Sequence, residues 1–197
     1  IWNNNQSKLS LDYAGNLTTS GVTLTGTEGL AANAAIKSGV TAINAGGTGS
    51  YATLNPLPAI NSMAAMTNYN GYIFYAGGAG ASVLSTVYSA KVNADGTIGS
   101  WNTLNTLPAI TRTHGLLAFN GYLFLVAGTT GVTNLSTVYS AKINTDGTIA
   151  AWQTLNTLPA IRYGPSSAIS NGYLFVLGGW NGGAYTSTVY SALINSN

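Results

Sequence analysis

The chain repeats one stretch three times: NGYIFYAGG at residues 70–78, NGYLFLVAG at 120–128 and NGYLFVLGG at 171–179. A second stretch follows each copy, as STVYSAKVN at 85–93, STVYSAKIN at 136–144 and STVYSALIN at 187–195. Equivalent positions are therefore 50 or 51 residues apart. A fixed period of this length is typical of proteins in which one supersecondary unit stacks on its neighbours to bury its faces.

Each repeat predicts four antiparallel strands. Asn-Gly between two apolar runs is the strongest short-range signal for a two-residue hairpin turn, and it opens every copy. The returning strand of the middle copy, YLFLV at 122–126, is apolar on both faces, so we expect it to be covered on both sides. STVYSAKI gives a third strand, and a fourth strand carries Trp152 after the turn at residues 144–147. These four strands describe one blade of a propeller.

The repeats resemble the kelch family of β-propeller repeats over about residues 50–197. The resemblance rests on the order of landmarks within each copy rather than on a single motif. They are Gly77-Gly78 and Gly178-Gly179 (Ala127-Gly128 in the middle copy), then Tyr88, Tyr139 and Tyr190, then Trp101 and Trp152, with Arg112 and Arg162 ahead of first strands. It implies a propeller scaffold and leaves the function open, because one fold hosts many functions.

The predicted fold is all-β, with three kelch-like four-stranded blades that form a partial propeller. A fourth strand at 50–58 comes first, and the repeats span 59–107, 108–158 and 159–197, the last of which stops after its third strand. Three blades fall below the roughly four to eight of a closed ring, so another subunit or further repeats must complete it. We expect self-association, as a homo-oligomer or a fibre, through two edge strands. One edge carries Tyr51, Thr53 and Leu54, and the other carries Val189, Tyr190 and Ala192.

Residues 1–49 differ from the repeats. SKLSLDYAGNLTTSGVTLTG at 7–26 alternates apolar and polar residues around Gly15-Asn16, which predicts a β-hairpin, and an Ala- and Gly-rich linker follows. The hairpin resembles the β-modules of phage tail fibres and bacterial surface fibres. Two interpretations stay open: an attachment or polymerisation element, and a small β-appendage of the propeller.

The composition limits the partners and the location. Charged residues make up 5% of the chain, the net charge is +2 and cysteine is absent, so no footprint for nucleic acid is visible. We expect no membrane insertion, because the longest apolar stretch is broken by Asn120-Gly121 and is shorter than the ~20 residues of a spanning helix. A surface rich in Ser, Thr, Asn and Gly favours an extracellular location or a cell or virion surface.

Catalysis is not expected. Asp12, Glu28, Asp95 and Asp146 are the only carboxylates, and His114, the single histidine, is interpreted as structural. We also expect no cofactor and no metal. NADGTIGSW at 93–101 is similar to the aspartate-box turn of sialidase propellers, but here Asp95 and Gly96 are adjacent. A sialidase or an oxidase of the galactose oxidase kind is therefore only a distant alternative.

The loops after the second strands differ between copies, and variable loops on a constant frame are where recognition usually resides. In the third copy, Trp180, Asn181 and Tyr185 are candidates for a platform that stacks on a sugar ring, although an exposed tryptophan folded over its own loop fits equally well. The candidate glycosylation sequons begin at Asn5, Asn16 and Asn134. The sequence thus predicts a non-catalytic structural or adhesive subunit of an extracellular fibre or surface filament. The alternative is a module that binds cell-surface glycans or a receptor, such as a phage tail-fibre tip.

Overall fold

The computed structural model describes residues 9–11, 17–19 and 51–195. The chain divides into two units, Ile1–Ala52 and Thr53–Asn197. In the first unit, β1 (Leu9–Leu11) pairs antiparallel with β2 (Leu17–Thr19), and the residues that connect these two strands lie outside the described residues. The sequons at Asn5 and Asn16, the predicted linker and most of the fibre-like stretch lie outside the described residues.

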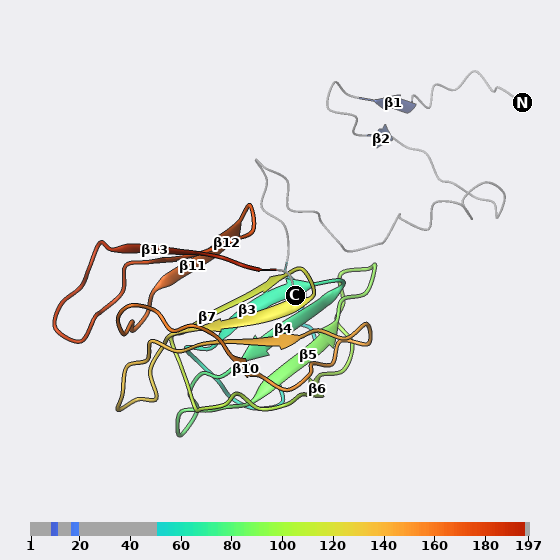
Figure 1. Cartoon of the computed structure of the whole chain (residues 1–197). Helices are drawn as coiled ribbons and strands as arrows, with labels where there is room; N and C mark the ends of the chain where they lie inside the picture. The colour runs from blue at the N-terminus through green and yellow to red at the C-terminus, as the bar shows by residue number, and fades with distance from the viewer. Residues whose placement is uncertain (1–8, 12–16, 20–50, 196–197) are drawn as a thin grey trace, which may run out of the picture. The chain divides into compact units, whose positions relative to one another are not determined.

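Three antiparallel sheets make up the described part of the second unit (Figure 1). The first contains β3 (Ala65–Tyr69), β4 (Tyr72–Ala76), β5 (Val87–Lys91) and β6 (Asn102–Thr103). The second contains β7 (Gly115–Phe119), β8 (Tyr122–Val126), β9 (Val138–Lys142) and β10 (Gln153–Thr154). The third contains β11 (Ser166–Ser170), β12 (Tyr173–Leu177) and β13 (Val189–Leu193). We call these sheets blades 1, 2 and 3, and they confirm an all-β, unclosed partial propeller.

Each Asn-Gly pair forms the turn that the sequence predicts. At the turn between β3 and β4, Asn70 has φ 46° and Gly71 has φ 78°, and the equivalent turns of the other blades have nearly the same angles. Positive φ at both central residues gives a turn whose twist matches that of the flanking strands. This local choice fixes the register in which the first two strands of every blade pair.

The Asp-Gly turns also repeat between the third and fourth strands. In blade 2, the Asp146 carboxylate accepts hydrogen bonds from the amide (3.0 Å) and the hydroxyl (2.7 Å) of Thr148, and Gly147 takes φ 79°. Asp95 and Thr97 repeat this geometry in blade 1. The bonds from Thr148 lower the pKa of Asp146, since they stabilise the carboxylate. Both aspartates therefore serve local turns.

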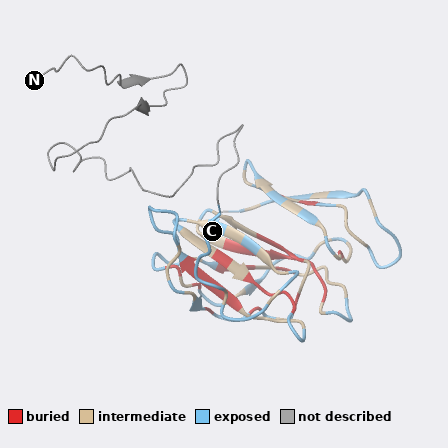
Figure 2. Ribbon diagram, turned by 180° about the vertical axis from the view of Figure 1, so that it is seen from behind, coloured by how far each residue is buried: buried red, intermediate tan, exposed pale blue. Residues whose placement is uncertain are grey.

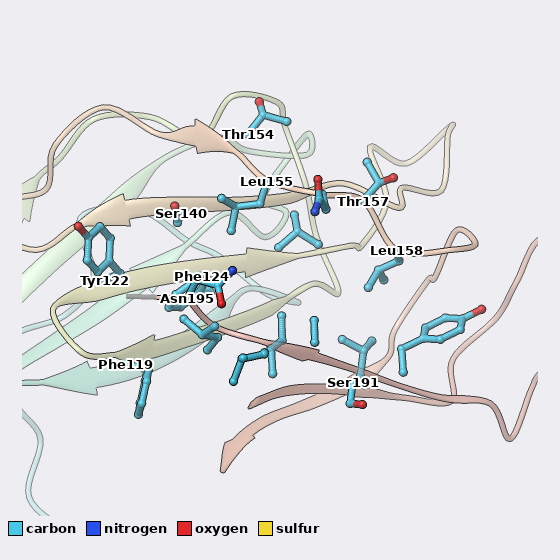
Figure 3. Close-up of a pocket in the computed structure, with 18 of the residues that line it drawn as sticks. Phe119, Tyr122, Phe124, Ser140, Thr154, Leu155, Thr157, Leu158, Ser191 and Asn195 are labelled. Carbon is cyan, nitrogen blue, oxygen red and sulfur yellow. The ribbon is translucent and has the colours of Figure 1, made fainter. Parts of the chain in front are cut away.

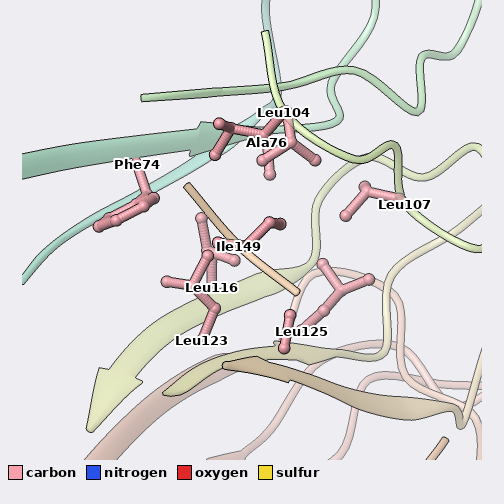
Figure 4. Packing of buried hydrophobic residues seen from close by; sticks show 10 residues of the cluster. Phe74, Ala76, Leu104, Leu107, Leu116, Leu123, Leu125 and Ile149 are labelled. Atoms are coloured by element: carbon pink, nitrogen blue, oxygen red, sulfur yellow. The ribbon is translucent and has the colours of Figure 1, made fainter. Parts of the chain in front are cut away.

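The blades stack side by side through their first strands, with β7 between β3 and β11. A cluster of buried apolar residues fills the junction of blades 1 and 2 (Figure 4). Its members are Phe74, Ala76, Val87, Leu104, Leu107, Leu116, Leu123, Leu125, Ala141 and Ile149. A smaller cluster joins blades 2 and 3 through Val126, Ala127, Val138, Leu174 and Val176. The middle strand β8 is thus covered on both faces, as predicted, because blade 2 has a neighbour on each side.

Glycine pairs let the chain pass closely between blades 1 and 2. A β-carbon at Gly77 would clash with the Thr111 carbonyl and lie 2.7 Å from Cε1 of His114. The next amide, that of Gly78, donates a 2.8 Å hydrogen bond to the same Thr111 carbonyl. Gly77 therefore lies where blade 2 leaves no room for a side chain.

Candidate functional site

An open recess of about 370 Å³ lies between the loops of blades 2 and 3. These loops follow the second strands, so the recess lies at the end of the blades opposite the Asn-Gly and Asp-Gly turns. The residues that line it come from both blades. They are Arg112, Thr129, Gly131, Val132, Asn134, Tyr163, Trp180 and Tyr185.

Two aromatic rings form one wall of the recess. The ring centroids of Trp180 and Tyr185 lie 5.1 Å apart with the planes at 75°, an edge-to-face pair. Trp180 is fixed by two 2.9 Å backbone hydrogen bonds to Tyr163, whereas Tyr185 is 82% exposed. An exposed aromatic ring on a fixed neighbour provides a surface on which a flat apolar face can stack.

The Asn181 side chain hydrogen-bonds within its own loop. Its Oδ1 accepts hydrogen bonds from the amides of Gly183 (3.0 Å) and Ala184 (2.9 Å), so the side chain shapes the loop between the two aromatic residues. Asn181 is not among the residues that line the recess. The structure therefore brings two of the three predicted residues together and gives the third a supporting position.

Arg112 is the charged residue that lines the recess, and the sequence analysis did not assign it to this site. No carboxylate pairs with it among the described residues, because Asp95 and Asp146 belong to turns at the opposite end of the blades. Its Nε is buried and makes no hydrogen bond in this part of the chain. The backbone of Arg112 pairs with that of Thr129, as the backbone of Tyr163 pairs with that of Trp180. Arg112 therefore corresponds to Tyr163 of the next repeat, and the two arginines occupy neighbouring positions of the repeat. This difference of one position was the signal in the sequence.

The third sequon falls inside the same recess. Asn134 is half-buried, and its backbone bridges Thr129 at the start of the same loop. Asn134 and Trp180 thus line the same recess.

A larger cavity of about 720 Å³ separates the outer parts of blades 2 and 3 (Figure 3). Phe124, Leu155 and Leu158 line it from blade 2, and Leu174 and Tyr190 line it from blade 3. Between blades 1 and 2, the hairpin before β10 buries Ile149, and Asn105 Nδ2 donates a 3.0 Å hydrogen bond to the Ile149 carbonyl. Among the described residues, blade 3 has no equivalent hairpin.

The outer edge of blade 3 is the second notable surface. The sequence VYSA occurs in β5, β9 and β13, and its first residue is 0% exposed at Val87 and 4% exposed at Val138 but 57% exposed at Val189. A fourth strand pairs with the third strand of blades 1 and 2 but not with that of blade 3. Much of blade 3 is accordingly coloured as exposed in Figure 2. Identical side chains thus differ in burial only because of what lies beside them.

The predicted assembly residues fall on two separate stretches. Val189, Tyr190 and Ala192 lie on the uncovered strand β13. Tyr51, Thr53 and Leu54 are exposed, and residues 51–58, predicted as a fourth strand, contain no strand. The physical reason is that a two-residue fourth strand, as in β6 and β10, exists only where a third strand pairs with it. Whether the two stretches meet in an assembly stays a prediction.

Two ionisable groups are buried between the blades. His114 is 6% exposed between Gly77 and Gly128, and burial lowers its pKa to about 4, an effect that the nearby Ala76 carbonyl partly opposes. Neither ring nitrogen makes a hydrogen bond of good geometry within the described part. Arg162 is 2% exposed and contacts Tyr190. Both side chains lie inside blade junctions.

A comparison with known protein families gives a match to the third repeat. The family model of the kelch motif matches residues 161–191, from the entry into blade 3 to the middle of β13. The third repeat matches the kelch motif, and the antiparallel sheets of all three repeats are consistent with kelch-like blades. The matched segment includes the glycine pair at 178–179 and Tyr190, the landmarks on which the resemblance rests. No curated protein matches the chain.

Other features of the described residues do not add a chemical site. No group of three or more His, Cys, Asp or Glu side chains lies close enough to hold a metal ion in the part of the chain that the structure covers. No helix in that part could cross a membrane. The recess and the open blade edges therefore remain the two candidate functional surfaces.

Proposed function

We propose that this protein is a non-catalytic structural or adhesive subunit of an extracellular assembly, in which copies complete each other's kelch-like blades. The exposed VYSA edge of blade 3 carries the proposal. A row of unpaired backbone groups beside exposed Val189 is a template for another strand, and folded proteins normally cover such edges. A contact of this head-to-tail kind closes into a ring or continues as a fibre, depending on its rotation.

The described polar groups support a role without catalysis. Asp95 and Asp146 hydrogen-bond the threonines of their own turns, and His114 is buried between two blades. None of them faces the recess. A chain with 5% charged residues and many Ser, Thr and Asn residues supports a place outside the cell or on a cell or virion surface.

Light scattering of the purified chain, together with electron microscopy, tests the proposal. We expect particles of at least two copies, seen as rings or filaments. A single 20.1 kDa species with an intact β-sheet circular dichroism spectrum would overturn the proposed function.

The recess supports a second candidate function, the recognition of glycans. Stacking of a sugar face on Tyr185 and Trp180 would supply apolar contact, and the unpaired Arg112 favours a sugar that carries a carboxylate. A glycan array that includes acidic and neutral sugars tests this function. Trp180→Ala should then weaken any saturable binding at least tenfold, while Lys142→Ala, at the opposite end of blade 2, should leave it unchanged. Binding that survives Trp180→Ala would exclude the recess.

A further inference from the structure

The junctions between blades follow one pattern of backbone hydrogen bonds. In each, four of the bonds that connect the chain entering a blade to the blade before it occur at equivalent positions. In the first junction they run from Leu104 to Val87, from Leu107 to Ser85, from Thr111 to Leu84 and from Gly78 to Thr111, over 2.8–3.0 Å. The second junction repeats them from Leu155 to Val138, from Leu158 to Ser136, from Arg162 to Leu135 and from Gly128 to Arg162, over 2.8–3.0 Å. The pattern is therefore a property of the repeat.

At the two ends of the described blades, the equivalent backbone groups form no such hydrogen bond. On blade 3 they are the carbonyls of Val189, Ser187 and Thr186 and the amide of Gly179. On the stretch before blade 1 they are the amides of Leu54, Leu57 and Asn61 and the carbonyl of Asn61. None of these groups makes a backbone hydrogen bond with another described residue. Donors at one end match acceptors at the other in number and in order.

Residues 55–61, the stretch before blade 1, are bound to blade 1 in the position that residues 105–111 take on blade 2. Asn55 Nδ2 donates to the carbonyls of Ile98 (3.1 Å) and Gly99 (3.3 Å), as Asn105 donates to Ile149 in blade 2. Trp101 Nε1 lies 3.4 Å from the Asn55 carbonyl, as Trp152 Nε1 does from Asn105. Residues 55–61 thus sit on blade 1 as residues 105–111 sit on blade 2.

Side-chain exposure at the first blade agrees with this match. Met66 of β3 is 64% exposed, whereas Leu116, at the same position of β7, is 4% exposed because blade 1 covers it. The exposed side of blade 1 and the exposed edge of blade 3 are therefore the two halves of a junction that the chain makes twice internally. Burial of these apolar groups would drive association.

We infer that residues 53–61 of a second copy complete blade 3 in a single register, with Thr53 opposite Tyr190 and the Leu54 amide bound to the Val189 carbonyl. This inference rests on the proposed self-assembly and specifies its contact. The register follows from Thr103 opposite Tyr88 and Thr154 opposite Tyr139. The donors before blade 1 and the acceptors on blade 3 belong to the same chain and match each other, so a second copy supplies what the first one needs. Two copies have six blades, within the usual ~4 to 8.

Cysteine cross-linking tests the register, and the chain has no cysteine of its own. Leu54 and Val189 would form a hydrogen-bonded antiparallel pair, with Cα atoms about 5.5 Å apart, which suits a disulfide. Leu54→Cys and Val189→Cys are prepared separately, mixed and oxidised mildly. We expect a disulfide-linked dimer in the mixture and none in either variant alone.

The control replaces Val189→Cys by Ala192→Cys, three residues along the same exposed strand and roughly 10 Å away. Equal cross-linking with Ala192→Cys, or no cross-linking in a sample that light scattering shows to be oligomeric, would overturn the register and leave self-assembly intact. A monomeric sample would overturn both the register and the proposed function.

Discussion

Arg162 donates a 2.9 Å hydrogen bond from Nη2 to the Tyr190 hydroxyl, and its guanidinium carbon lies 4.8 Å from the centre of the tyrosine ring. The arginine is almost fully buried and has no carboxylate partner among the described residues. A second bond, from Nη1 to the Ile161 carbonyl at 2.8 Å, satisfies another donor. The tyrosine therefore connects the entry into blade 3 to that blade's third strand.

Tyr190→Phe should destabilise the fold by about 1–3 kcal/mol, because a buried guanidinium donor would lose its acceptor while the ring contact stays. Urea denaturation followed by circular dichroism measures the change. Tyr139→Phe is the matched control: this tyrosine occupies the same position of blade 2, where Thr111 replaces the arginine, and its hydroxyl makes no hydrogen bond with described residues. Equal effects of the two changes would contradict the role of Arg162.

Gly77→Ala and Gly178→Ala should differ in stability although both glycines follow the second strand with φ near 62°. A methyl group on Gly77 clashes with blade 2, so a loss of about 2–4 kcal/mol is expected. At Gly178 the nearest atom would be the Thr186 carbonyl oxygen at 3.3 Å, so only the backbone cost of about 1–2 kcal/mol remains. Denaturation midpoints measured under monomeric conditions compare the two, and a larger loss at Gly178 would refute the packing argument.

The folded protein should lose stability as the pH falls from about 6.5 to 4. Burial lowers the pKa of His114 from 6.5 to about 4, so the unfolded chain binds a proton in this range that the folded chain resists. The stabilising contribution is complete above pH 6.5 and is lost on acidification, by about 3 kcal/mol in total. Unfolding at pH 7 and pH 4.5 measures it. In His114→Gln the difference between these pH values should shrink, and an unchanged difference would assign the effect elsewhere.

Proline substitutions compare the Leu54 amide, which is unused within the described blades, with the equivalent Leu104 amide, which is hydrogen-bonded. Leu54→Pro should leave the isolated fold stable and abolish assembly, because the Leu54 amide is unused within the described blades but is required by the proposed contact. Leu104→Pro removes the equivalent amide, which bonds Val87 at 2.9 Å, and a buried side chain, so it should destabilise the chain by several kcal/mol. Light scattering and thermal melts together report both effects. Normal assembly of Leu54→Pro would be incompatible with the inferred contact.

Much of the fold could be predicted because its determinants are local. Positive φ at Asn70 and Gly71 follows from the residue types, and so does the turn that Asp146 and Thr148 stabilise. The position of Arg112 could not be predicted in the same way. Arg112 and Trp180 line the same recess because blades 2 and 3 meet there. The sequence of one repeat does not show this meeting, since the position of Arg112 is occupied by Tyr163 in the next repeat.

The sequence by itself determined the repeat, its turns and the pairing of strands within a blade, since each depends on neighbouring residues whose φ angles and alternation are set locally. Only the tertiary structure decided which copies are buried. Val87 and Val189 occupy the same position of the same motif, yet one is enclosed and the other is open, because burial depends on the blade and the strand beside it. The function proposed here follows from that difference.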